Sequence, residues 1–193
     1  MRLLEEKIRS EGHVLPGNIL KVDGFLNQQI DIDLLDAMGR EFAALFQGTR
    51  VTKILTVEAS GIALACITAR HLGNVPVIFG KKHKTLNRDE SVYSTPIFSF
   101  THHTSYDVTV AKRLLLPGDR VLIIDDFLAD GKAVRGMMDL IAQAGARLTG
   151  VGIAIEKGFQ GGGDKLRAEG VPVHSLAIID EMNGEEIRFR PQP

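Results

Sequence analysis

Apolar residues along the chain follow two alternating patterns. Short unbroken runs of Val, Ile and Leu are typical of strands that are buried on both faces of a parallel sheet. Between these runs, apolar residues recur every three or four positions, as they do on one face of a helix. The predicted strands are 53–57, 75–80, 121–125, 148–155 and 173–179. The predicted helices are 61–72, 133–144 and a short helix between Gly163 and Gly170.

Strands that alternate with helices predict an α/β fold with a doubly wound parallel sheet of about five strands. The N-terminal region stands outside this alternation. Residues 2–11 have the pattern of an amphipathic helix, and residues 18–26 look extended. Asp31 or Asp33 is suited to cap a further helix, which ends near Gly48.

Residues 81–113 also interrupt the alternation. They begin with several basic residues and continue with two β-like stretches, 92–100 and 106–111, around a turn rich in Thr, His and Ser. A long insertion between core elements is typical of a lid over a binding site. A solvated surface hairpin is the alternative that these residues leave open.

Composition narrows the functional classes. A length of 193 residues, with 44% hydrophobic and 24% charged residues, suits one domain with a sizeable core. The net charge of −1 gives no general attraction to nucleic acid or to membranes. The single cysteine, Cys66, lies on a predicted apolar helix face, so we expect it to pack in the core. The charged N-terminus lacks a signal peptide's apolar core, and no run approaches membrane-span length, so we expect a cytoplasmic protein.

The segment 121–133 carries the clearest candidate chemistry. Four apolar residues lead into Asp125 and Asp126, and a loop of small residues then precedes a helix. Ligands of open parallel sheets bind beyond the carboxyl ends of the strands, where both acids would lie. Two carboxylates accept hydrogen bonds from a vicinal diol or lie near Mg²⁺, and a small-residue loop before a helix presents N–H groups to an anion. A diol beside a phosphate describes a ribose 5-phosphate.

This segment resembles the signature of the type I phosphoribosyltransferases, which bind phosphoribosyl pyrophosphate. The likeness extends over nearly the whole chain and implies one phosphoribosyltransferase domain at 1–193, with a flexible hood or lid at 81–113. It implies that Asp125 and Asp126 bind the ribose and Mg²⁺. The residues that it assigns to the 5-phosphate are Ala129, Asp130, Gly131, Lys132 and Ala133.

A second strand-to-helix turn, at 57–62, again combines small residues with a helix start. Backbone donors at such a turn suit an anion. The resemblance implies that this turn and a following lysine bind the pyrophosphate. The residues concerned are Glu58, Ala59, Ser60, Gly61 and Lys82. Lys82 would neutralise the leaving group, whereas the plain alternative is a solvated lysine.

Within this family, the chain most resembles the bacterial xanthine phosphoribosyltransferases, through residues 22–27, 82–84 and 156–160. The likeness implies a base-recognition segment at 1–30. The residues that it assigns to xanthine are Leu20, Asn27 and Lys157. An ammonium group has only donors, so Lys157 suits an oxo group and not the exocyclic amine of adenine.

Ala129 departs from the pattern of the hypoxanthine–guanine enzymes, which usually have an aspartate at the matching position. That acid handles the ring proton of the purine, so no general base is assigned in this chain. Xanthine carries an additional electron-withdrawing carbonyl and loses a ring proton readily, which lowers the need for a strong base.

The expected function is therefore purine salvage, in which phosphoribosyl pyrophosphate and xanthine give xanthosine 5′-monophosphate and pyrophosphate. The resemblance implies Mg²⁺ as the cofactor and a homodimer as the assembly. One alternative keeps the family but changes the base to guanine, hypoxanthine or, against Lys157, adenine. The other is a regulator that senses phosphoribosyl pyrophosphate and binds nucleic acid, although the near-neutral charge argues against it.

Overall fold

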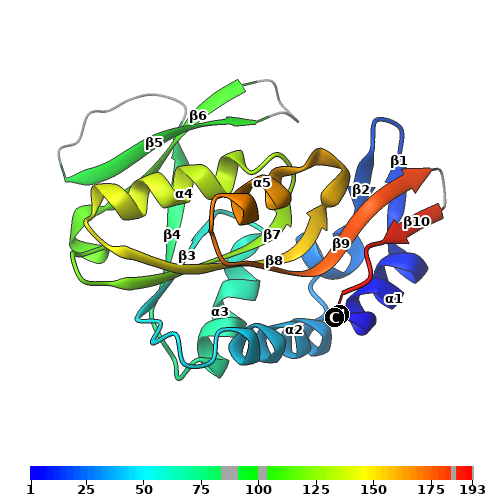
Figure 1. Ribbon diagram of the computed structural model, residues 1–193, viewed down its shortest axis with the longest axis horizontal. Coiled ribbons are helices and arrows are strands. Elements are labelled where there is room, and N and C mark those ends of the chain that lie inside the picture. Colours follow the sequence, from blue (N-terminus) through cyan, green and yellow to red (C-terminus); the bar gives the residue numbers. More distant parts are fainter. Residues whose placement is uncertain (84–90, 100–103, 184–185, 193) are drawn as a thin grey trace.

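A mostly parallel sheet forms the centre of the molecule (Figure 1). The computed structural model describes residues 1–83, 91–99, 104–183 and 186–192. The strands of the sheet are β3 (Lys53–Val57), β4 (Val77–His83), β5 (Val92–Ser99), β6 (Thr104–Ala111), β7 (Arg120–Leu128), β8 (Arg147–Lys157), β9 (Val173–Asn183) and β10 (Glu186–Phe189). Among the described residues their order is β10-β9-β8-β7-β3-β4-β6-β5.

The parallel part of the sheet consists of β9, β8, β7, β3 and β4, which confirms the predicted fold class. Antiparallel strands extend it on both sides. Strand β10 pairs with β9, and the ribbon β5–β6 pairs with β4 through β6. The hydrophobic pattern did not predict β10, because a four-residue edge strand buries only Ile187 fully.

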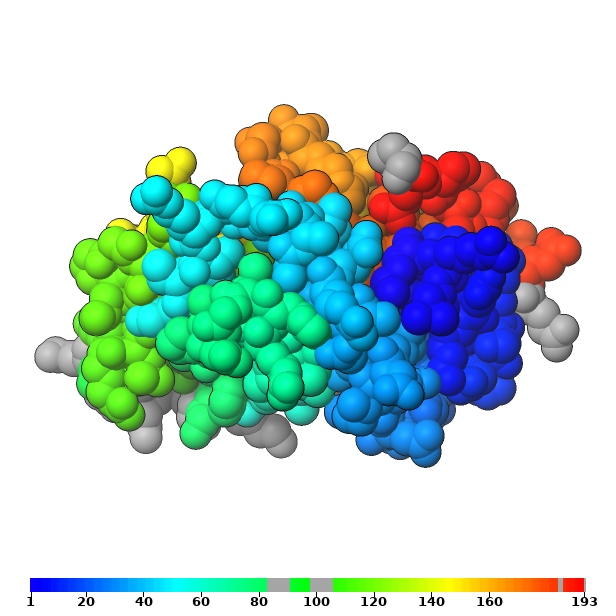
Figure 2. Space-filling view, turned by 90° about the horizontal axis from the view of Figure 1, so that it is seen from below, coloured from blue at the N-terminus to red at the C-terminus, as the bar shows by residue number. Residues whose placement is uncertain are grey.

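Helices cover both faces of the sheet. They are α1 (Arg2–Glu11), α2 (Ile32–Leu45), α3 (Gly61–His71), α4 (Lys132–Gln143) and α5 (Gly162–Ala168), with short 3₁₀ turns η2 (Lys112–Leu114) and η3 (Gly158–Gln160). On β7, Leu122 and Ile124 pack with α2 and α3, whereas Val121 and Ile123 pack with α4. Both faces of β7 are therefore apolar, which explains its unbroken hydrophobic run. Figure 2 shows α2 and α3 from outside, with the N-terminal segment beside them.

The N-terminal region differs in part from its prediction. Strands β1 (His13–Leu15) and β2 (Ile19–Lys21) form a separate antiparallel hairpin. The chain then winds into the π-helical turn η1 (Asp23–Asn27), so the prediction that residues 18–26 are extended is wrong beyond Lys21. The buried side chains of Phe25 and Leu26 account for this turn, since it places both in the core.

The described residues of 81–113 continue the sheet rather than leaving it. Ile97 and Val108 are buried, and Ile97 packs directly on Gly136 of α4. The described part of this segment is thus anchored and is not a solvated hairpin. The segments 84–90 and 100–103 lie outside the described residues, so the predicted lid is not tested.

Two further expectations concern single features. Cys66 is exposed on α3, so its predicted place in the core is wrong. The buried face of that helix is formed instead by Leu64, Ala65 and Ala69.

Across the described residues, no helix combines the length and the apolar character needed to cross a bilayer.

Candidate active site

The predicted acid pair lies in the second half of β7, close to where the neighbouring strand β3 ends. Asp125 and Asp126 are only 7% and 8% exposed. The backbone N–H of Asp126 donates to Asp125 Oδ1 over 3.0 Å, which fixes the first carboxylate against the second residue. Two nearly buried carboxylates at one strand end require compensation from hydrogen-bond donors or from a cation.

The pKa of Asp125 also indicates that the acid pair needs a nearby positive charge or hydrogen-bond donors. Burial raises the pKa of Asp125 well above its usual range, and the negative charge of Asp126 raises that pKa further. The positive charge of Lys82 acts in the opposite direction. No group of three or more His, Cys, Asp or Glu side chains in the described residues is arranged to hold a metal ion. Two neighbouring carboxylates supply the oxygen ligands that suit a Mg²⁺ ion, which commonly takes its other ligands from water and substrate phosphates.

The predicted phosphate loop follows directly. Gly131 adopts a left-handed conformation, with φ of 89°, and precedes the first residue of α4. The Asp130 carboxylate accepts from the backbone N–H of Lys132 over 3.2 Å and lies 3.3 Å from its ammonium group. The side chain of Asp130 thus stabilises the loop itself. The positive end of α4 faces the same loop, as an anion site requires.

The turn after β3 contacts this site through Gly61. A Cβ atom on Gly61 would lie 2.1 Å from Thr56 Oγ1 and 2.9 Å from Asp125 Oδ1, so only glycine fits between them. Glu58 accepts the backbone N–H of Lys82 over 2.5 Å, and the peptide between Glu58 and Ala59 is cis. The turn after β3 therefore lies against the acid pair of β7, at the carboxyl ends of the parallel strands.

Tyr106 joins this group, although the sequence pattern placed it only at the start of a strand. The Lys82 ammonium lies 5.2 Å from the centre of its ring. Burial raises the pKa of the Tyr106 phenol, and the charge of Asp125 adds to the effect. Tyr106 comes from β6, and its proximity depends on the pairing of that strand with β4.

Lys157 ends β8, next to the strand that carries the acid pair. Its ammonium donates to the backbone carbonyl of Asn18 over 3.0 Å and lies 5.8 Å from the centre of the Phe127 ring. Burial lowers the pKa of this half-buried lysine. The contact brings the tip of the β1–β2 hairpin to the carboxyl end of β8. Phe127 had no signal in the sequence beyond its place after the acids.

The other two residues predicted to bind xanthine lie on the N-terminal segment. Leu20 is 6% exposed and packs in the core, whereas Asn27 is exposed at the end of η1. The hairpin therefore approaches Lys157 with the Asn18 backbone, two residues before Leu20.

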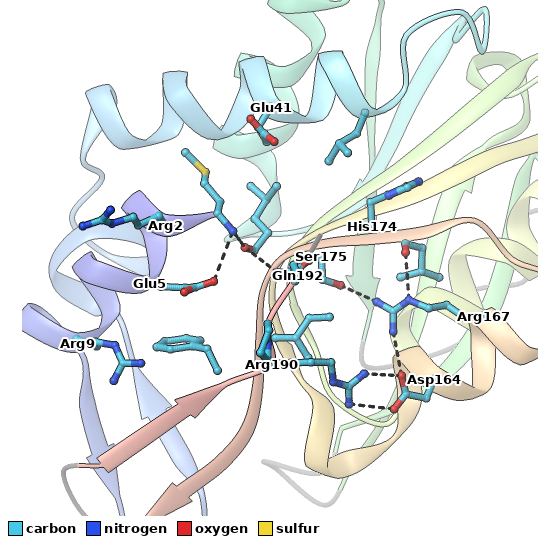
Figure 3. A pocket seen from close by; sticks show the side chains of 17 residues that line it. Arg2, Glu5, Arg9, Glu41, Asp164, Arg167, His174, Ser175, Arg190 and Gln192 are labelled. Carbon is cyan, nitrogen blue, oxygen red and sulfur yellow. Dashed lines mark hydrogen bonds and ion pairs between the residues drawn. The ribbon is translucent and has the colours of Figure 1, made fainter.

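A cavity of about 860 Å³ opens elsewhere, between α1, α2, β9 and the C-terminal residues (Figure 3). Arginines line it, and two of them form ion pairs with acidic residues of the protein. Arg167 and Arg190 both pair with Asp164, and Arg190 also pairs with Asp180. The candidate chemistry therefore belongs to the strand ends and not to this cavity.

Comparison with known proteins identifies the family of the chain. The phosphoribosyl transferase domain matches residues 27–190. The xanthine phosphoribosyltransferase of Bifidobacterium longum (strain NCC 2705) is 58% identical over 192 residues, which are 98% of this chain and 100% of the relative. The enzyme of the same name from Lachnoclostridium phytofermentans is 54% identical, over 96% of this chain and 95% of the relative.

Solved structures of more distant proteins share the fold. The adenine phosphoribosyltransferase of Giardia lamblia, complexed with 9-deazaadenine, matches with a TM-score of 0.75 and 22% identity, over 93% of this chain and 98% of that chain. The adenine phosphoribosyltransferase of Rhodothermus marinus matches with a TM-score of 0.72 and 22% identity, over 93% and 100% of the two chains. The family match over most of the chain and the relatives that are more than half identical lead to one conclusion: the chain belongs to the phosphoribosyltransferase family.

Proposed function

We propose that this protein transfers the 5-phosphoribosyl group of phosphoribosyl pyrophosphate to xanthine, giving xanthosine 5′-monophosphate and pyrophosphate. One observation carries the proposal. The acid pair and small-residue loop at the end of β7 lie beside Lys157 at the end of β8, where Leu128 pairs with Glu156. The proposed site for phosphoribosyl pyrophosphate therefore neighbours a lysine whose ammonium group can only donate hydrogen bonds, as an oxo base requires. The names of relatives that are more than half identical support the choice of base.

The donor substrate would lie across three groups. Asp125 and Asp126 accept hydrogen bonds from the ribose hydroxyls, and the backbone of 129–133 with the start of α4 binds the 5-phosphate. The turn at 58–61 and Lys82 receive the pyrophosphate. Fixed donors at both phosphates hold the sugar in place and stabilise charge on the leaving group as the glycosidic bond breaks.

Mg²⁺ would be held by Asp125 and Asp126 together with the substrate. When bound, it supplies positive charge to the pyrophosphate. The raised pKa of Asp125 in the free protein agrees with this arrangement, because a buried like-charged pair is incomplete without a cation or donors.

The base would be selected by residues 1–30 together with Lys157. The Lys157 ammonium donates to the oxo edge of the purine, and Asn27 offers both a donor and an acceptor. Residue 129 is alanine and provides no carboxylate for the ring proton. The ready ionisation of xanthine compensates for that difference. The hood that the family implies within 81–113 would cover the site and exclude water, which would otherwise hydrolyse the activated sugar.

Product formation with each purine in turn tests the proposal. The protein is incubated with phosphoribosyl pyrophosphate, Mg²⁺ and xanthine, guanine, hypoxanthine or adenine, and nucleotides are separated by chromatography. We expect the highest kcat/KM with xanthine and no turnover after Mg²⁺ is chelated. A preference for another base would assign the enzyme to that base. No turnover with any base, together with tight nucleic-acid binding, would favour a regulator. Light scattering of the same sample tests the homodimer that the family implies.

A further inference from the structure

Helix α5 lies directly against the predicted phosphate loop. The backbone N–H of Gly162, its first residue, donates to the carbonyl of Ala129 over 3.2 Å. A Cβ atom at position 162 would lie 2.3 Å from Ala129 O, 2.5 Å from Asp130 C and 2.6 Å from Gly131 N. All three are backbone atoms, so a side chain here would displace the loop itself rather than a flexible neighbour.

A buried ion pair holds α5 in this place. Glu156 on β8 is completely buried and accepts from both terminal nitrogens of Arg167, over 3.0 and 2.5 Å. The hydroxyl of Ser175 donates to the same carboxylate over 2.5 Å. A Cβ atom on Gly163 would lie 2.1 Å from Glu156 Oε1, so the helix packs closely on the carboxylate.

The other side of α5 is fixed by the C-terminal segment. Arg190 donates to both oxygens of Asp164, over 2.8 and 3.1 Å, and Asp164 also accepts from Arg167 over 3.2 Å. Figure 3 shows these side chains converging between α5 and β9. The Glu156–Arg167 and Arg190–Asp164 pairs each have two hydrogen bonds, and such two-point pairing fixes the orientation of both side chains.

We propose that Gly162 is a positioning residue of the donor site, and that the Glu156–Arg167 pair holds it against the loop. This inference rests on the proposed function. The loop N–H groups bind the 5-phosphate only in a narrow geometry, and misplacement by about 1 Å costs up to roughly a hundredfold in rate. Lys157 follows Glu156 on β8. The end of this strand therefore positions both the lysine proposed to bind the nucleobase and the helix that packs against the phosphate loop.

Gly162→Ala tests the proposal through the two Michaelis constants. We expect KM for phosphoribosyl pyrophosphate to rise roughly ten- to a hundredfold, because the added methyl displaces loop backbone, while KM for xanthine stays within about twofold. Titration calorimetry with phosphoribosyl pyrophosphate and Mg²⁺ should show the same loss of affinity. Lys165→Ala, which removes an exposed side chain from the same helix, serves as the matched control and should leave both constants unchanged.

An unchanged KM for phosphoribosyl pyrophosphate, or an equal rise in both constants, would overturn the proposal. If Gly162→Ala fails to fold, Arg167→Lys keeps the charge but loses the paired donors to Glu156, and the same selective rise in KM is then expected. Equal constants in that folded variant would also overturn the proposal. Wild-type protein that binds no phosphoribosyl pyrophosphate would instead refute the proposed function, so the two failures are distinct.

Discussion

Replacing Lys157 by methionine tests whether this lysine recognises the purine, separately from the binding of phosphoribosyl pyrophosphate. The change keeps the length of the apolar stem and removes only the ammonium. That group donates to the Asn18 carbonyl and has two further protons for a substrate. Because the lysine is already half-buried beside the Phe127 ring, its bond to an oxo group forms with little added desolvation.

The expected loss follows from the value of one charge-assisted hydrogen bond. Such a bond contributes about 1.5–3 kcal/mol, so kcat/KM for xanthine should fall roughly ten- to a hundredfold in Lys157→Met. KM for phosphoribosyl pyrophosphate should not change, since the acid pair and both turns are intact. Lys157→Arg restores donors and should recover part of the activity.

Steady-state kinetics with xanthine and adenine would measure these effects, with Lys165→Met as the control for loss of a lysine. The thermal midpoint of each variant shows whether the hairpin has loosened after loss of its bond to Asn18. Burial lowers the pKa of Lys157, so wild-type activity with xanthine should decline as pH rises through a value below the usual 10.5. Xanthine kinetics in Lys157→Met that match the wild type, in a folded protein, would refute the role of this lysine.

Substitutions at three other positions address the acid pair and the core beneath it. Asp125→Asn with Asp126→Asn should abolish use of phosphoribosyl pyrophosphate, and turnover by the double variant would contradict ribose binding by the pair. The single variant Asp125→Asn should be more stable than the wild type, because the raised pKa of Asp125 makes wild-type stability fall as pH rises from 3.8 through that pKa. Melting curves between about pH 4 and pH 8 should show this advantage growing with pH, and a constant difference would argue against it. Thr56→Val should raise the free energy of unfolding by about 1 kcal/mol in urea titrations, because Thr56 Oγ1 is buried without a partner among the described residues. Thr56→Ser keeps the hydroxyl and should show no such gain.

The parallel core and the turns that follow its strands were accessible from sequence for a physical reason. Strands such as β7 are apolar on both faces, so their runs are continuous and unambiguous. The turns that follow them need small residues and glycine, which leave a local signature at Gly131 and Gly61. Family resemblance then supplied the roles that local chemistry alone leaves open.

Features that depend on distant partners were missed. The sequence shows Glu156 as an acid before a lysine, and only the fold reveals that Arg167 and Ser175 make it a buried anchor. Tyr106 reaches the acid pair only through strand pairing across an insertion. The exposure of Cys66 was not predicted because α3 is nearly all apolar in sequence, so its hydrophobic periodicity does not identify the buried face.

The carbonyl of Asn18 that meets Lys157 belongs to a hairpin located before residue 27, where the match to the shared domain begins. The two partners are 139 positions apart in the chain, and the hairpin forms its own small sheet. Under the proposed function, nucleobase preference would depend on a hairpin whose small sheet is distinct from the sheet that carries the sugar-binding residues. Exchanging this hairpin for that of a relative with another base preference would then change the purine that is used while the site for the sugar stays the same.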